Sequence, residues 1–122
     1  MMGMTLPLAE LLSEAELRAV IARFYESVVR DDLLAPLFVD VDRATQEERL
    51  YRFIRMTSGR PTDKLDGIYL RDVHRSLRLS DAHFERRRAL VTAAVRACGH
   101  GEEVVVAWAE YDALFRAWVL GS

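Results

Sequence analysis

The sequence predicts an all-α fold, and three observations indicate it. Apolar residues recur at intervals of three and four along several long stretches, as on helices with one buried face. The alternation of apolar and polar residues that would indicate strands is absent. Only three prolines interrupt the 122 residues, and capping residues precede the periodic stretches.

The first third of the chain predicts a short lead-in helix and a longer one. Leu6 to Leu12 can form the lead-in helix. Ser13 and Glu16 have the spacing of a capping box, which predicts a helix from there to about Arg30. Tyr25 lies at the edge of the apolar stripe of this helix. The stripe consists of Leu17, Val20, Ile21, Phe24 and Val28.

The middle of the chain predicts a second helix between two turns. Leu33 to Phe38 forms a short apolar turn around Pro36. Asp42 can cap a helix from Arg43 to about Met56, which Ser58-Gly59-Arg60-Pro61 then ends. Thr62 to Gly67 is expected to be a loop. Ile68 to Leu77 is expected to hold one or two helical turns that carry His74.

Two longer helices are predicted in the last third. Ser80 caps a helix from about Asp81 to Cys98, and Gly99 stands where helices commonly end in a left-handed residue. The last helix runs from about Glu102 to Leu120. Its aromatic face consists of Trp108, Tyr111, Phe115 and Trp118.

Length and composition narrow the class of protein. We expect one domain over residues 1–122, with 1–12 as a lead-in segment, because 122 residues is a common domain size. The net charge of −2 argues against a general polyanion binder. Cys98 is the only cysteine, which excludes an internal disulfide. The sequence shows no apolar run of about 20 residues and no basic secretory leader, so we expect a cytoplasmic protein without membrane contact.

His74 is the candidate metal ligand. A neutral imidazole is a good iron ligand, although a lone histidine is more often structural. His83, in the first turn of a helix, and His100, between two glycines, are better explained as cap or loop residues.

Several polar and aromatic residues could surround a ligand. A tyrosine at the edge of an apolar stripe, such as Tyr25, usually points its hydroxyl at water. In a pocket, the Tyr25 hydroxyl would instead donate to a bound ligand, with Gln46 as a second donor. Phe38 and Phe53 are most simply core residues. Arg87 interrupts an apolar stripe. In one interpretation its aliphatic stem lies along the edge of the core and its guanidinium reaches water. In the other, its guanidinium lies near a bound anion or ligand. Arg86 to Arg88 resembles a solvated helix face more than a nucleic-acid site, because no aromatic residue interleaves the arginines.

Several short segments between about Ala15 and Phe115 share a characteristic order and spacing. They are Phe24-Tyr25-Glu26-Ser27-Val28, Asp31-Asp32, Leu34-Ala35-Pro36-Leu37-Phe38, the helix with Phe53, Gly67 seven residues before His74, Leu79, and His83-Phe84. In this order and spacing, the segments resemble the truncated (two-over-two) haemoglobins of bacteria.

The resemblance implies a two-over-two helical sandwich that holds haem b (iron protoporphyrin IX). His74 matches the proximal iron ligand, and Tyr25 matches the distal tyrosine that donates to the bound ligand. Gln46, Leu50 and Arg87 then fall in the distal pocket. The residues that contact the cofactor would be His74, Phe38, Arg49, Leu50, Phe53, Val73, Leu79 and Phe84, with Arg49 near a propionate.

The sequence departs from the family pattern at three places. Gly59-Arg60 replaces a double glycine, and Leu65-Asp66 replaces the tyrosine usual before Gly67. Arg87 stands where the family has tryptophan or a smaller apolar residue. The segment around Leu77 to Arg86 lies nearest the third subgroup, without that subgroup's tryptophan.

The implied function is reversible binding of a diatomic gas (oxygen, nitric oxide or carbon monoxide) at the His74-ligated iron, in a monomer or homodimer. One alternative is a haem-dependent nitric oxide dioxygenase or peroxide-reacting enzyme. Because the chain has no flavin or nicotinamide fingerprint, that enzyme would need a separate reductase. The other alternative is a haem-free regulatory or interaction domain.

Overall fold

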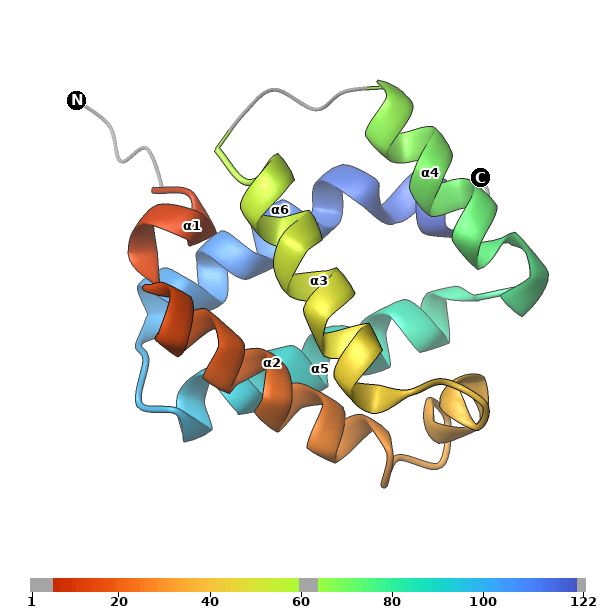
Figure 1. The fold of residues 1–122 in the computed structure, drawn as a ribbon, viewed down its shortest axis with the longest axis horizontal. Helices are drawn as coiled ribbons and strands as arrows, with labels where there is room; N and C mark the ends of the chain where they lie inside the picture. The colour runs from red at the N-terminus through yellow and green to blue at the C-terminus, as the bar shows by residue number, and fades with distance from the viewer. Residues whose placement is uncertain (1–5, 60–63, 121–122) are drawn as a thin grey trace.

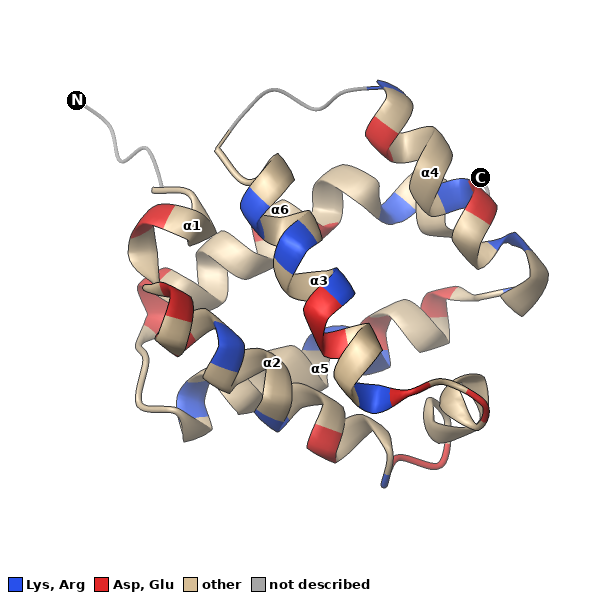
Figure 2. Cartoon of the chain, viewed as in Figure 1, with Lys and Arg blue, Asp and Glu red and all other residues tan. Residues whose placement is uncertain are grey.

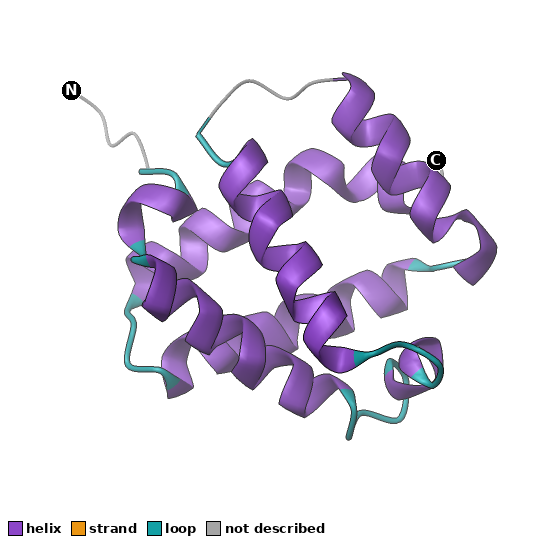
Figure 3. Cartoon of the chain, in the orientation of Figure 1, coloured by secondary structure: helices purple, strands orange, loops and turns teal. Residues whose placement is uncertain are grey.

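The structure is a computed structural model that describes residues 6–59 and 64–120. These residues form helices joined by short turns, and no strand occurs among them (Figure 3). The helices, in chain order, are α1 (Leu8–Leu11), α2 (Glu14–Val28), η1 (Ala35–Phe38), α3 (Arg43–Thr57), α4 (Lys64–His74), η2 (Arg75–Leu77), α5 (Asp81–Ala97) and α6 (Glu102–Leu120). η1 and η2 are single 3₁₀ turns. The predicted all-α class is confirmed.

Four long helices form two packed layers, as expected for a two-over-two sandwich (Figure 1). α2 packs against α3 within one layer, and α5 packs against α6 within the other. The layers meet where α2 contacts α5. α4 packs against α6 at the edge of the molecule, and α1 covers parts of α3 and α6.

Most of the predicted helix ends are confirmed by hydrogen bonds. The Ser13 hydroxyl accepts from the amide of Glu16 (3.1 Å), and the Glu16 carboxylate accepts from the Ser13 amide (2.9 Å). Asp42 accepts from the amide of Thr45 (2.9 Å) at the start of α3. Gly99, with φ of +88°, follows the end of α5. Each cap satisfies backbone groups that the helix itself leaves unpaired.

A single core joins α1, α2, α3, α5 and α6. Trp108 of α6, 1% exposed, is one of its largest side chains. Fully burying an apolar side chain of this kind contributes about 1.5–3 kcal/mol, so these residues dominate the stability of the fold. The other buried core residues are Leu8, Leu12, Leu17, Val20, Ile21, Phe24, Tyr25, Val28, Leu34, Tyr51, Ile54, Val91, Ala94, Val95, Val104 and Ala107.

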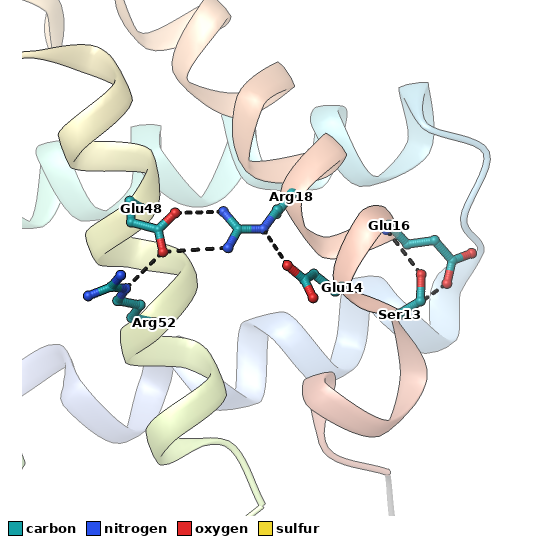
Figure 4. Close-up of polar contacts among 6 residues, drawn as sticks. All are labelled: Ser13, Glu14, Glu16, Arg18, Glu48 and Arg52. Carbon is teal, nitrogen blue, oxygen red and sulfur yellow. Dashed lines mark hydrogen bonds and ion pairs between the residues drawn. The ribbon is translucent and has the colours of Figure 1, made fainter.

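A charged network fixes α3 against α2 (Figure 4). Arg18 Nη1 donates to Glu48 Oε1 (2.7 Å), and Arg18 Nε donates to Glu14 Oε2 (3.0 Å). Arg52 Nε donates to the second oxygen of Glu48 (2.8 Å). The guanidinium of Arg18 also lies 3.8 Å from the ring centroid of Tyr51. The network bridges the two helices that carry Tyr25 and Gln46.

Charges of both signs are interspersed along the helices (Figure 2). Along α3, basic and acidic residues mix within consecutive turns. This agrees with the slightly acidic net charge of −2. Among the described residues, no helix is both long enough and apolar enough to cross a bilayer.

The start of α4 differs from the sequence prediction. Thr62 to Gly67 was expected to be a loop, but Lys64 to Gly67 lie in the first turns of α4, while residues 62 and 63 lie outside the described part. The residue at this position of α4 is a glycine because α4 lies very close to α6 there. A Cβ atom on Gly67 would lie 2.3 Å from Cε2 of Trp118, so only glycine permits this packing.

Smaller differences concern two other helix ends. α2 ends at Val28 and not near Arg30, although Arg30 still makes a turn through its amide to the carbonyl of Ser27 (3.1 Å). α3 extends to Thr57, with Ser58 as its C-terminal cap. Gly59 follows with φ of +87°. The predicted stop at Arg60 and Pro61 lies outside the described residues.

Candidate functional site

His74 is the last residue of α4 and is half-buried. Its Nδ1 donates to the carbonyl oxygen of Leu70 over 2.7 Å, which leaves the lone pair on Nε2. No residue in the described part of the chain pairs with Nε2. Burial lowers the pKa of His74. The hydrogen bond to Leu70 opposes this lowering of the pKa, and the positive charge of Arg87 lowers the pKa further. The imidazole is therefore neutral and held in the tautomer that suits a metal ligand.

The other two histidines have local roles, as the sequence predicted. His83 Nδ1 accepts from the backbone amide of Ser80 (3.1 Å) and lies 2.9 Å from the Ser80 hydroxyl, so it closes a capping box at the start of α5. His100 follows Gly99 in the turn before α6, and its amide donates to the carbonyl of Val95 (3.1 Å). Neither residue belongs to α4, the helix that carries His74.

Tyr25 and Gln46 are brought together from α2 and α3. Gln46 Nε2 donates to the Tyr25 hydroxyl oxygen over 3.3 Å, so the proton of that hydroxyl stays free for another acceptor. Burial raises the pKa of Tyr25, and the bond from Gln46 and the charge of Arg87 oppose this rise, so the phenol is protonated near neutral pH. Phe24 and Phe38 contact the ring edge-on, with centroids 4.9 and 5.8 Å away.

Arg87 makes a buried ion pair that the sequence analysis missed. Its Nη1 lies 2.5 Å from Oδ2 of Asp112, and the Asp112 side chain is only 8% exposed. The guanidinium carbon lies 5.4 Å from the ring centroid of Phe24. Burial lowers the pKa of Arg87, but the charge of Asp112, its hydrogen bond and the nearby Tyr25 and Tyr111 together raise the pKa, so the side chain stays charged. The signal for Asp112 was available: it is an acidic residue within the apolar stripe, between Trp108 and Phe115.

Phe53 links α3, α4 and α6 through its ring. It stacks on Tyr69 of α4, with centroids 6.0 Å apart and an interplanar angle of 23°, and meets Phe115 of α6 edge-on at 5.5 Å. Tyr69 was not among the predicted site residues. Its position five residues before His74 in a helix was the available signal.

The remaining α3 and α4 candidates differ in exposure. Leu50 is half-buried and packs on the core, whereas Arg49 is exposed and has no acidic partner within the described part of the chain. Val73, the neighbour of His74, is 49% exposed. Arg49 and Val73 therefore have surface available for a further group.

Leu79 and Phe84 lie at the start of α5, on either side of Ser80. Leu79 is half-buried in the segment between η2 and α5. Phe84 is half-buried too, and the guanidinium carbon of Arg116 lies 5.4 Å from its ring centroid. Among the described residues, the rings that contact Tyr25 are those of Phe24 and Phe38, so Phe84 lies apart from the aromatic cluster around Tyr25.

Comparisons with known proteins agree with this fold. The family model for bacterial-like globins matches residues 10–117. The group 1 truncated haemoglobin GlbN of Synechocystis is 33% identical over an alignment of 87 residues that covers 68% of this chain and 69% of that protein. That protein is a group 1 member, whereas the sequence analysis expected the third subgroup to be the nearest.

Two solved structures share the fold. The 2/2 haemoglobin of Synechococcus, in the cyanomet state and with covalently attached haem, is 20% identical with a TM-score of 0.79, over 95% of this chain and 99% of that one. An Fe(III) truncated haemoglobin variant of Tetrahymena pyriformis is 23% identical with a TM-score of 0.81, and the match covers 95% of this chain and 99% of that one. These structures show the two-over-two fold, and the family match and the GlbN relative show that the chain belongs to the bacterial-like globins, as a truncated haemoglobin.

Proposed function

We propose that the chain binds haem b with His74 as the iron ligand and reversibly binds a diatomic gas on the side of Tyr25. The observation that carries this proposal is the hydrogen bond from His74 Nδ1 to the carbonyl of Leu70 (2.7 Å). It fixes a neutral imidazole with Nε2 unprotonated, which is the form that binds iron. Ferrous haem, when bound, supplies the coordination position for oxygen, nitric oxide or carbon monoxide.

The apolar side chains near His74 fit a flat apolar group. Tyr69 is 51% exposed and Val73 is 49% exposed, although both belong to a helix that carries a buried face. Covering apolar surface contributes about 25 cal/mol per Å², so a porphyrin that packs on these residues would gain binding free energy. Phe38 of η1 and Leu50 and Phe53 of α3 are half-buried and would pack on the same group. Arg49, exposed on α3, would pair with a propionate.

Tyr25 and Gln46 would stabilise the bound gas. Because Gln46 donates to the Tyr25 oxygen, the Tyr25 hydroxyl proton is available to a ligand in the distal pocket. Phe24 and Phe38 hold the ring in place through edge-on contacts. A hydrogen bond to an acceptor with partial charge contributes about 1.5–3 kcal/mol, which slows escape of the ligand by about ten-fold or more.

The first test is an absorption spectrum of the purified protein, in the ferric state and then reduced under carbon monoxide. We expect a Soret band that shifts with carbon monoxide, and we expect His74→Ala to abolish the normal spectrum. His83→Ala is the matched control, because His83 caps α5, and its spectrum should match the parent. A chain with no Soret band after hemin addition would be the haem-free interaction domain instead.

The second test measures the oxygen dissociation rate. Tyr25→Phe should raise this rate by about ten-fold, because the distal donor is lost. Tyr51→Phe is the matched control, since Tyr51 is buried on α3 beneath Arg18 and should leave the rate unchanged. An equal rate in the parent and in Tyr25→Phe would remove Tyr25 from this role.

A further inference from the structure

The end of α4 that carries His74 has few buried side chains to hold it. Among the described residues, those that α4 buries are Asp66 and Gly67, which lie near its start, and η2, which follows His74, has no buried residue. Val73, the neighbour of His74, is 49% exposed. The direction in which the imidazole points therefore depends on contacts made one to two turns earlier in α4.

The first of these contacts joins Gly67 to Trp118 of α6. A Cβ atom on Gly67 would lie 2.6 Å from Nε1 of Trp118, and closer still to Cδ2 and Cε2, so the backbone of α4 lies directly against the indole. α4 packs against α6 here (Figure 1). An indole is large and rigid and turns about only two side-chain bonds, so it sets the separation of the two helices more precisely than a flexible side chain would.

The second contact holds α4 from another side. Tyr69 stacks on Phe53 of α3, with ring centroids 6.0 Å apart and an interplanar angle of 23°. Successive residues of an α-helix are turned by about 100°, so the side chain of Tyr69 leaves the helix roughly opposite to Gly67. The indole of Trp118 and the ring of Phe53 thus bracket α4. Two such contacts limit both the shift of α4 and its rotation about its own axis.

His74 turns together with α4. Its Nδ1 donates to the carbonyl of Leu70, a residue of the same helix, over 2.7 Å, so the imidazole is fixed relative to α4 itself. The seven residues from Gly67 to His74 make nearly two full turns, which places both on one side of α4, about 10 Å apart along its axis. Because Nε2 lies roughly 5 Å from that axis, a rotation of α4 by about 20° moves this atom by about 2 Å.

We propose that Trp118, through its contact with Gly67, positions α4 so that Nε2 of His74 points at the haem iron. This inference rests on the proposed function. Trp118 is a positioning residue, since it acts through α4 and not on the iron or the gas. A ligating group must be held within about 0.5 Å and about 10–20° of its productive geometry, which is less than the movement that a displaced α4 allows. Trp118 therefore controls the strength of the iron–histidine bond and, through that bond, the affinity for the gas.

The experiment measures the iron–histidine stretching band of the ferrous protein by resonance Raman spectroscopy, together with the affinity for carbon monoxide. The variants are Trp118→Leu, Gly67→Ala, the double variant with both changes, and Trp118→Phe, which keeps a flat ring. The matched control is Trp108→Phe, because Trp108 is a core residue of the same helix and is 1% exposed. Thermal unfolding of each apo protein shows which variants lose stability alone.

We expect Trp118→Leu and Gly67→Ala each to shift the band and to change the affinity for carbon monoxide by about ten-fold, since a displacement of about 1 Å can cost up to about 100-fold at a reacting centre. The double variant should return toward the parent, because the alanine methyl group fills space that the indole leaves. Trp118→Phe should stay near the parent. Trp108→Phe should lower the Tm and leave the band unchanged.

Three results would overturn the positioning role. They are an unchanged band in Trp118→Leu with a lowered Tm, an equal shift in Trp108→Phe, and additive shifts in the double variant, which would mean that Trp118 acts independently of Gly67. Any of these results, in a protein whose Soret band His74→Ala abolishes, would leave the proposed function intact. A parent protein with no Soret band would instead reject the proposed function and the positioning role with it.

Discussion

Replacing Gly67 with alanine tests how closely α4 must approach α6. Gly67 is a buried residue within α4, and a Cβ atom added to it would lie 2.3 Å from Cε2 and 2.4 Å from Cδ2 of Trp118. Two effects oppose each other in Gly67→Ala. Alanine stabilises a helix interior by about 0.5–1 kcal/mol relative to glycine. The added methyl group, however, occupies the space of a ring, which must move.

The steric effect should exceed the gain in helix propensity. Carbon atoms in contact lie about 3.5–4.0 Å apart, so Trp118 or α4 has to shift by roughly 1 Å or more. Overpacking of this kind costs about 1–3 kcal/mol. The net loss in the free energy of unfolding is then about 0.5–2 kcal/mol after the gain in helix propensity is subtracted. For a chain of this size, that lowers the Tm by about 2–8 °C.

The assay is thermal unfolding of the apo protein, followed by the helical circular dichroism signal. Trp118→Leu provides the matched background, because the smaller side chain frees the space that the methyl group needs. In that background, Gly67→Ala should stabilise the protein, so the sign of its effect should change. A Tm for Gly67→Ala equal to or above that of the parent would refute the inferred packing of α4 on α6.

Three further substitutions test other contacts. Thr57→Val should lower the free energy of unfolding by about 1–2 kcal/mol in urea titrations, because it removes the 2.6 Å hydrogen bond to the Tyr111 hydroxyl. Ser13→Ala should lower it by about 1 kcal/mol, through loss of the N-terminal cap of α2. The hydrogen bond from Arg18 lowers the pKa of Glu48 from 4.5 to about 2, so this stabilising contribution is complete above pH 4.5 and is lost as the pH falls toward 2. Glu48→Gln should therefore flatten the acid dependence of stability over that range; an unchanged slope would contradict it.

The sequence predicted the features that depend on local chemistry. Glu102 to Leu120 was predicted as a helix and is α6, because its apolar spacing and flanking glycines need no tertiary context. The capping residues Ser13 and Asp42 were also identified, since each pairs with a backbone amide three residues away. Motif spacing, through the resemblance, supplied the two-over-two arrangement, which local chemistry alone does not determine.

The features that the sequence analysis missed depend on contacts between distant segments. Gly67 was assigned to a loop, and only the indole of Trp118, far along the chain in α6, explains a glycine inside α4. Arg87 and Asp112 each interrupt an apolar stripe of their own helix. Pairing them requires the relative rotation of α5 and α6, which a single sequence does not give. Such pairs can be found by searching for residues of opposite charge that interrupt the apolar stripes of two helices expected to face each other.

The two halves of the candidate site are held in place by different amounts of buried surface. α2 buries six residues, including Phe24 and Tyr25, so the core of the fold determines where the Tyr25 hydroxyl lies. α4 buries only Asp66 and Gly67, and its apolar side chains near His74 remain half exposed. Packing of the protein alone therefore determines the position of Tyr25, whereas the apolar side chains near His74 still lack cover. In the proposed function the cofactor supplies that cover. Substitutions that remove apolar surface from α4 should therefore affect haem retention more than the stability of the apo protein. Substitutions that remove apolar surface from α2 should affect the stability of the apo protein more than haem retention.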